Sequence, residues 1–336
     1  MKVLTFLVML VLPFGSSIAA SKVVNIYSFR ESKLIKPLID EFTRTTGIKV
    51  NIVSGKADKL MKRLIADGDN SFADLILTTN VARLEKAKQL GLLSKINSDY
   101  LTQNTPAEFR DTEGYWFGIS TRARAIFYAK DSINPTDISS YQDLTDKKWR
   151  GQICSRKGSH IYNRAMVASF IANHGEQWTK TWLQGFVKNL AMRPNGGDRD
   201  QLRNIKKGNC QLALGNSYYY GMMSDSAKMQ DREVYQHVGI IWPNQDNTGT
   251  HINISGAAII SSAKNKHNAQ RFIEFLLMPK AQEMYSKINY EYPASTIAKP
   301  VEKLESWGAF TADRQGIKTL SKYLTRADTL IAGSGW

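Results

Sequence analysis

The sequence predicts an α/β protein of two lobes around a central cleft. Short β-branched runs alternate with amphipathic helical patterns between residues 22 and 91, and again between residues 150 and 221. Hydrophobic residues make up 42% of the chain and charged residues 22%, which is typical of folded globular proteins. The length suffices for two ordinary domains. Later elements could belong to either unit, which suggests that the two units share a cleft.

The first unit is expected near the N-terminus. Strands are predicted at 22–28, 48–55 and 73–79, and helices at 31–47, 57–68 and 81–91. This alternation predicts an open, largely parallel sheet with helices on both faces. In the first helix Gly47 is placed for a C-terminal cap, and Pro37 is expected near the first turn, where a missing amide costs least. The apolar face of this helix is expected to comprise Leu34, Ile35, Leu38, Ile39 and Phe42.

The second unit follows a strand-rich stretch at 114–130. Residues 140–155 are expected to form a helix that leads into a strand. Helices are predicted at 162–175, 176–190 and 198–208, a strand at 210–215, and a further helix from the tyrosines that follow. A late strand at 254–261 precedes helices at 265–278 and 280–288. Open α/β sheets bind ligands beyond the carboxyl ends of their strands, and the bend at 215–221 has such a position.

Residues 1–20 have the pattern of a secretory signal peptide. Lys2 precedes an apolar run from Val3 to Leu12, and Ser17-Ile18-Ala19 fits the small-x-small cleavage rule, with Ala20 as a second possible end. The run is too short for a permanent membrane helix, and no later stretch approaches the required length. The signal contains no lipobox cysteine. We therefore expect an exported, soluble chain without a lipid anchor or stable membrane insertion.

The two cysteines, Cys154 and Cys210, both lie in the exported part. An oxidising compartment favours a disulfide between them, and two buried free thiols are the alternative. In the chain-entropy model this bond would stabilise the fold by roughly 4 kcal/mol.

A net charge of +15 and a pI near 9.6 raise the question of nucleic-acid binding. The cations are spread along the chain and usually alternate with acids, and no arginine-rich arm, RNP-like box or helix-turn-helix is present. We expect no nucleic-acid partner, only a basic surface that attracts anions or anionic lipid.

Motifs for hydrolysis and for divalent metals are missing. There is no G-x-S-x-G elbow, H-E-x-x-H, P-loop or G-x-G-x-x-G. The five histidines never pair at metal-ligand spacing. "GGDRDQ" resembles half of a calcium loop, but it lacks the third ligand position and the distal glutamate. Its acids are expected to cap the helix that follows.

The stretch "GNSYYYG" at 215–221 offers phenol groups instead. A tyrosine hydroxyl has a pKa near 10 and becomes a good ligand only when a strong Lewis acid removes its proton. Three phenolates would neutralise Fe(III), whereas softer divalent metals prefer His or Cys. Two adjacent tyrosines can converge on one atom only at an irregular strand-to-helix turn. Core or surface packing remains the alternative for each ring.

Several stretches together resemble the periplasmic ferric-ion-binding proteins of bacterial iron(III) ABC transporters. They are "VNIYSFR", "EFTRTTGIKV", "ADLILTTNVARL", "YWFGISTRARAIFY", "RPNGGDRDQ", "GNSYYYG" and "GTHINISGAAII", and they cover nearly the whole exported chain. The resemblance implies the bilobal type II periplasmic-binding-protein fold, with a hinge and a central cleft. It places a discontinuous first lobe at 21–121 plus 246–296, and a second lobe at 122–245 plus 297–336.

The resemblance also implies the metal ligands. The tyrosine pair of an N-x-Y-Y motif maps onto Tyr218 and Tyr219, and a third ligand maps onto Tyr162 in "GSHIYNRAM". Tyr220 falls outside the pair, and Tyr27 ends a strand, so packing is expected for both.

Some relatives carry a first-lobe His, or His-Tyr, where this chain has Glu31 and Ser32; others carry a glutamate where Thr79 stands. No first-lobe histidine ligand is therefore expected. A synergistic anion such as carbonate, or water, is expected to complete the coordination. Arg30 and Arg122 are the candidates for holding it, with Arg124 as an alternative. Glu31 could complete the shell instead, or cap the helix that follows it.

The function implied is that of a periplasmic Fe(III) receptor that closes on the ion and delivers it to an inner-membrane ABC permease. Such a receptor is expected to be a monomer and to catalyse no reaction. The alternatives are a receptor for an oxyanion or small organic anion, and a secreted hydrolase.

Overall fold

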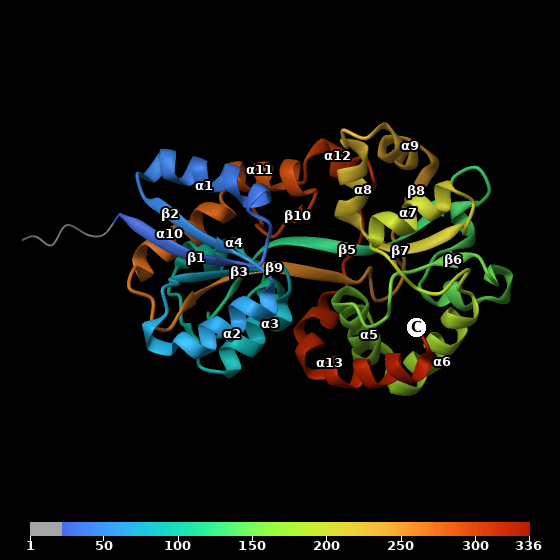
Figure 1. Ribbon diagram of the computed structural model, residues 1–336, viewed down its shortest axis with the longest axis horizontal. Helices are drawn as coiled ribbons and strands as arrows, with labels where there is room; N and C mark the ends of the chain where they lie inside the picture. Colours follow the sequence, from blue (N-terminus) through green and yellow to red (C-terminus); the bar gives the residue numbers. More distant parts are fainter. Residues whose placement is uncertain (1–21) are drawn as a thin grey trace, which may run out of the picture.

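A computed structural model describes residues 22–336, except for the side chains of residues 316–318. The chain forms two α/β lobes side by side, joined by long strands that cross between them (Figure 1). The predicted signal peptide lies outside the described residues. Within those residues, no helix has the length and apolar character needed to cross a membrane.

One continuous path of strands runs through both lobes in the order β2-β1-β3-β9-β5-β7-β6, with β4, β8 and β10 paired alongside. The strands are β1 Val23–Ser28, β2 Lys49–Ser54, β3 Leu75–Thr78, β4 Leu93–Ser94, β5 Phe117–Ala129, β6 Ile153–Cys154, β7 Leu212–Asn216, β8 Val238–Ile241, β9 Ile252–Ile260 and β10 Tyr292–Pro293.

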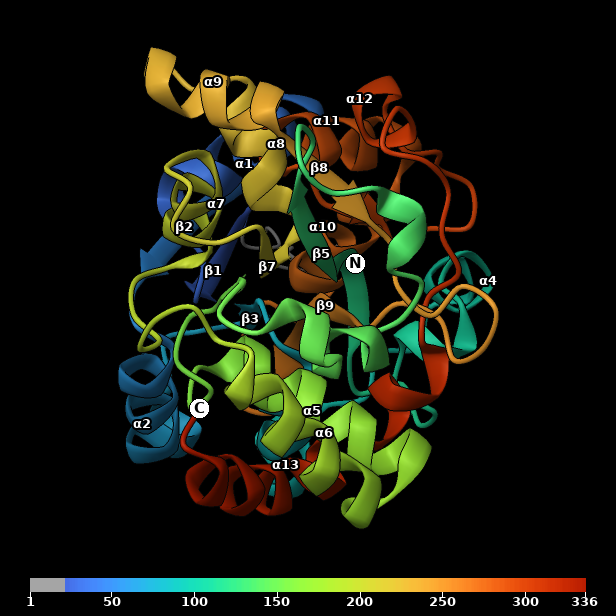
Figure 2. The ribbon, with the colours of Figure 1, turned by 90° about the vertical axis from the view of Figure 1, so that its right-hand side faces the viewer.

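Helices cover both faces of these strands. They are α1 Ser32–Thr46, α2 Ala57–Asp67, α3 Val81–Gln89, α4 Asp99–Asn104, α5 Ile161–His174, α6 Glu176–Lys188, α7 Asp198–Lys206, α8 Ser217–Ser224, α9 Met229–His237, α10 Lys266–Leu277, α11 Pro279–Asn289, α12 Glu302–Glu305 and α13 Arg314–Ser334. Viewed from the second lobe, α7, α8 and α9 lie on one side of the strands and α5, α6 and α13 on the other (Figure 2).

The parallel pairing expected of the first three strands is confirmed, but the sheet as a whole is mixed. β1 is parallel to β2 and β3, and β6 is parallel to β7. The pairings of β9 with β3 and β5, and of β5 with β7 and β8, are antiparallel. The cause is the single 13-residue strand β5, which pairs with β9 through its first part and with β7 and β8 through its second. The predicted alternation is local, whereas these pairings join distant segments.

Helix α1 follows its sequence pattern closely. Gly47 is left-handed, with φ of 70°, and its amide donates to the Thr43 carbonyl, as a C-terminal cap does. Pro37 is the sixth helical residue, so the prediction of a first-turn position is wrong. The carbonyl that loses its partner belongs to Lys33, an exposed residue, where water can replace the amide. The residues buried by this helix are Ile35, Leu38, Ile39 and Phe42.

The helix expected before β6 is also absent. Residues 142–145 and 147–149 form two short 3₁₀ turns instead. The Asp143 carboxylate accepts hydrogen bonds from the amides of Ser139 and Ser140, at 2.7 and 2.9 Å. Such side-chain bonds compete with helix formation and favour turns.

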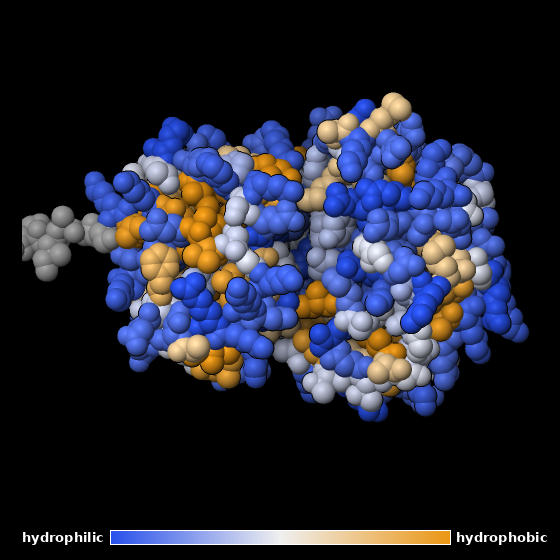
Figure 3. All heavy atoms as spheres, in the orientation of Figure 1, coloured by the Kyte–Doolittle hydropathy of each residue, from blue (hydrophilic) through white to orange (hydrophobic). Residues whose placement is uncertain are grey.

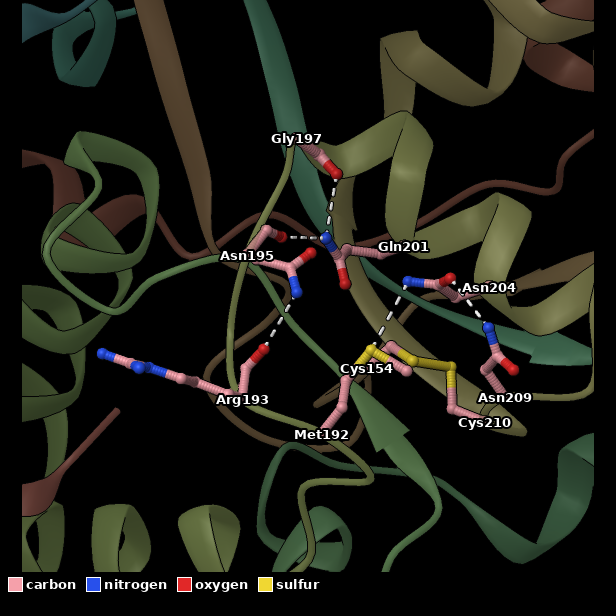
Figure 4. Close-up of a disulfide and its surroundings, with 9 residues drawn as sticks. All are labelled: Cys154, Met192, Arg193, Asn195, Gly197, Gln201, Asn204, Asn209 and Cys210. Carbon is pink, nitrogen blue, oxygen red and sulfur yellow. Dashed lines mark hydrogen bonds between the residues drawn. A yellow bond between two sulfur atoms is a disulfide. The ribbon is translucent and has the colours of Figure 1, made fainter.

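The predicted disulfide between Cys154 and Cys210 is confirmed, with the two Cα atoms 5.8 Å apart (Figure 4). It joins the end of β6 to Cys210, two residues before β7 begins. Asn204 lies beside it, donating to the Met192 sulfur and accepting from the Asn209 amide (Figure 4). Strand β6 leads through a short loop to α5, and β7 leads directly into α8.

Candidate metal-binding cleft

A cavity of about 260 Å³ lies between the two lobes. The groove that leads to it has mainly hydrophilic walls (Figure 3). One wall comes from the start of α1 and the end of β3, and the other from α5, α7 and α8, which face α1 across the centre in Figure 1. The lining residues are Phe29, Arg30, Glu31, Lys33, Leu34, Thr79, Arg122, Tyr162, Arg199, Tyr218, Tyr219, Met222 and Glu291.

The three tyrosines predicted as ligands come together in this cavity. Strand β7 ends at Asn216 and α8 begins at Ser217, so Tyr218 and Tyr219 lie in the first turn of the helix. Their ring centres are 4.2 Å apart. The Tyr218 hydroxyl donates to the hydroxyl of Tyr162, at 3.0 Å, across from α8 on the first turn of α5. The phenol oxygens therefore cluster as the strand-to-helix turn predicts.

A buried polar network lies beneath the tyrosines. Arg124 donates to Asp198 at 2.6 Å, to Asn216 at 3.1 Å and to Asn163 at 2.6 Å. The Asp198 carboxylate also accepts from the Asn216 amide, at 2.9 Å. Because Asn216 immediately precedes α8, this network fixes the turn from which the tyrosines project. Arg124 does not line the cavity, and its guanidinium lies 6.0 Å from the ring centre of Tyr162.

The sequence predicts that Asp198 and Asp200 both cap α7, and this is wrong for Asp198. Asp200 does accept from the Gly197 amide at 2.8 Å, as expected of a cap. Asp198 instead pairs with Arg124 and, at 3.1 Å, with Arg156. Within the described residues, no group of three or more His, Cys, Asp or Glu side chains is arranged to hold a metal.

Arg30 and Arg122 line the opposite side of the cavity. Arg30 donates to Glu291 at 2.7 Å and to the Ser255 hydroxyl at 3.0 Å, and Arg122 donates to the same hydroxyl at 3.1 Å. Arg122 also donates to the Thr79 carbonyl. Burial opposes ionisation of Glu291, but Arg30 and Arg122 outweigh it and lower the pKa of this carboxyl below its usual value. Glu291 therefore offsets part of the positive charge; no local motif marks it in the sequence.

Glu31 lies on the first-lobe wall. It occupies the N-cap position of α1 but makes no side-chain capping bond, so the capping alternative is wrong. Its carboxylate pairs with Lys33 at 2.9 Å, and the side chain is 70% exposed. It is therefore free to turn toward a ligand in the cavity.

The electrostatics of the cavity keep the phenols of Tyr218 and Tyr219 protonated. Burial, followed by the proximity of Tyr162, raises the pKa of Tyr218 well above its usual value, and the same two causes raise the pKa of Tyr219. Burial and the charge of Arg156 lower the pKa of the neighbouring His160 to about 4. Ionisation of these phenols at neutral pH thus requires a cation in the cavity.

Two other tyrosines are packing residues, as expected. Tyr220 is buried and donates to the Val238 carbonyl at 2.8 Å, away from the cavity. Tyr27 is fully buried, and the guanidinium of Arg63 lies 5.4 Å from its ring centre.

The sequence model of the bacterial extracellular solute-binding proteins matches residues 70–312. Iron uptake protein A1 of Synechocystis sp. is 36% identical over 324 residues, which cover 96% of this chain and 90% of the relative. Iron uptake protein A2 of the same organism is 36% identical over 335 residues, which cover 99% of this chain and 95% of the relative.

Solved structures similar to this chain also include proteins that bind iron. A Trichodesmium protein in complex with iron and citrate ligands is 39% identical, with a TM-score of 0.89, over 94% of this chain and 99% of that one. The ferric binding protein from Campylobacter jejuni is 39% identical, with a TM-score of 0.86, over 93% of this chain and 99% of that one. The fold class predicted from the sequence, the bilobal α/β fold of type II periplasmic binding proteins, is confirmed.

Proposed function

The chain belongs to the family of bacterial extracellular solute-binding proteins, and we propose that it is the periplasmic receptor for ferric ion of an ABC transporter. The observation that carries this proposal is the meeting of Tyr162, Tyr218 and Tyr219 in one cavity between the lobes. The names of the relatives, iron uptake protein and ferric binding protein, support it.

The chemistry of the cavity suits a hard trivalent ion. Three phenolates would neutralise Fe(III) charge for charge. The ligand-free cavity disfavours ionised phenols, and the charge of the bound ion would stabilise them. In our assignment Tyr218 and Tyr219 come from one helix turn and Tyr162 from another helix. The Asp198–Arg124 network holds the first of these helices in place.

We assign completion of the coordination to an anion held by Arg30 and Arg122, with Arg124 in the network beneath the tyrosines. Carbonate and a small carboxylate such as citrate both suit this role, and one related structure contains citrate. Glu31, on the same wall as Arg30 and opposite the tyrosines, is the alternative oxygen donor.

Delivery of the ion requires a permease in the inner membrane, and membership of this family implies such a partner. We assign residues 21–121 plus 246–296 to the first lobe, and 122–245 plus 297–336 to the second. Closure of the two lobes on the ion would present one shape to the permease. The protein would act in the periplasm as a monomer, without catalytic turnover.

The test is a titration of the purified, iron-free protein with Fe(III) and bicarbonate, followed in the visible spectrum. We expect a phenolate-to-iron charge-transfer band that is lost or strongly weakened in Tyr218→Phe and Tyr219→Phe. Tyr220→Phe is the matched control, because its hydroxyl faces Val238, and it should keep the band. A protein that stays colourless and binds no ferric ion would rule out the proposal.

A receptor for an oxyanion or small organic anion is the second candidate, because two arginines line the same cavity. Calorimetric titration with citrate or phosphate, without iron, separates the two functions. This second candidate would be favoured if the anion bound as tightly without iron as with it, and with equal affinity to wild type and Tyr219→Phe. Binding that requires Fe(III) would favour the first.

A further inference from the structure

Tyr290 has an unusual backbone at the end of α11. Its φ is 55° and its ψ is 32°, in the left-handed region; Asn244 is the only other described residue, glycines aside, with a positive φ. An aromatic residue in this region costs free energy, of the order of 1 kcal/mol or more, unless its surroundings hold it there. The contacts of Tyr290 show what holds it.

The ring of Tyr290 packs directly on α8, the helix that carries Tyr218 and Tyr219. A Cβ atom at Gly221 would lie 2.4 Å from the Tyr290 ring, so only glycine permits this approach. Helix α11 packs on α1 and α10, whereas α8 packs on α7 and α9. Tyr290 therefore joins two helices that belong to different lobes in our assignment.

The hydroxyl of Tyr290 is bound at the end of the same helix. It donates to the carboxylate of Asp225, the C-cap residue of α8. Lys303 donates to the other oxygen of Asp225 and, at 2.9 Å, to the hydroxyl of Ser224. Hydrogen bonds to charged groups are about twice as strong as neutral ones. The bonds to Asp225 therefore hold Tyr290 and Lys303 at the end of α8.

The next residue reaches the arginines. Glu291 accepts from Arg30 at 2.7 Å and from Ser255 at 3.0 Å, and it also accepts from Ser120 on β5. Tyr290 therefore contacts α8, the helix that carries the tyrosine ligands. The next residue, Glu291, contacts the arginine side chain that faces this helix across the cavity.

We propose that Tyr290 is a positioning residue that sets the distance between α8 and the arginine pair and thereby slows release of the bound ion. It acts through Gly221 and Asp225 and touches neither the ion nor its ligands. This inference rests on the proposed function for its consequence, but the positioning itself does not require iron.

Two variants test it, Tyr290→Phe and Asp225→Asn, with Tyr292→Phe as the matched control. Tyr292 is two residues further along, on β10, and its hydroxyl approaches the Leu304 carbonyl and not α8. In the iron-free protein, hydrogen exchange of the α8 amides is measured by mass spectrometry. Both variants should exchange faster over residues 217–224, whereas the control should match the wild type. Unchanged exchange in both variants would overturn the positioning role.

The second measurement uses protein loaded with Fe(III) and bicarbonate. Loss of the charge-transfer band to excess chelator should be up to about tenfold faster in each variant, the effect of losing one charge-assisted hydrogen bond. The wavelength of the band should stay that of the wild type. Equal release rates, or a shifted band, would contradict the proposal. If the wild type takes up no ferric ion, the proposed function fails, and the exchange result still decides the role of Tyr290.

Discussion

Asp198 shows how a single buried charge supports the tyrosines. Its side chain is fully buried between Arg124 and Arg156, and its carboxylate holds the amide that precedes α8. A buried charge with charged, hydrogen-bonded partners is tolerated, whereas removal of one partner leaves an uncompensated charge. The network therefore makes the position of the tyrosine helix depend on residues that never enter the cavity.

His251 provides a prediction about pH. Burial, reinforced by the charges of Arg124 and Arg122, lowers the pKa of His251 to about 3. In the unfolded chain the pKa returns to about 6.5, so the unfolded state binds the extra proton first as the pH falls. Above pH 6.5 protonation of His251 does not reduce the free energy of unfolding. As the pH falls from 6.5 toward 3, this free energy decreases, because only the unfolded state takes up the proton. By pH 5 this group alone should cost about 2 kcal/mol of unfolding free energy.

The measurement is urea unfolding of wild type and His251→Gln at pH 7.5 and pH 5. The variant should lose less stability between the two values than the wild type does, whatever its stability at pH 7.5. His267→Gln, at an exposed histidine, should retain the wild-type dependence. Identical pH dependence in wild type and His251→Gln would refute the assignment.

At the scale of elements, the disulfide holds together the two strands that lead into the site. Cys154 and Cys210 are 56 residues apart in the sequence, and closure of a loop of that length lowers the entropy of the unfolded chain. We expect Cys154→Ala combined with Cys210→Ala to lower the free energy of unfolding by about 4 kcal/mol relative to the oxidised protein.

Chemical denaturation under oxidising and reducing conditions makes this comparison. Reduced wild type is the control, and its stability should approach that of the double variant. A double variant within 1 kcal/mol of the oxidised protein would show that the covalent link contributes little.

Elements were predictable where their signal is local. The apolar face and glycine cap of α1 depend on residues that are close together in the sequence, and so does the strand-to-helix turn at Tyr218. The mixed sheet was not predictable, because β9 pairs with β3 across more than half the chain. Glu291 was missed for the same reason: its partner Arg30 lies 261 residues away. Helix α13, which packs along α5, was not anticipated.

At the scale of the whole molecule, the net charge of +15 bears on ligand binding only through the arginines that line the cleft. Arg30 faces the cavity from the end of β1, whereas the tyrosines project from the far side. A ligand that contacts only one wall gains nothing from closure. A ferric ion with an anion contacts both, so the two together should shift the population toward a closed form.

Small-angle X-ray scattering tests this coupling directly. The radius of gyration should fall when Fe(III) and bicarbonate are added together, and should stay at the ligand-free value with bicarbonate alone, because the anion by itself reaches only the arginines. Tyr219→Phe should contract less than the wild type at the same ligand concentrations, since it lacks one phenolate on the second wall. Tyr220→Phe is the control and should contract fully, because its hydroxyl points to Val238 and not to the cleft. Contraction with bicarbonate alone would mean that the anion drives closure, and no contraction with both ligands would mean that binding does not close the lobes.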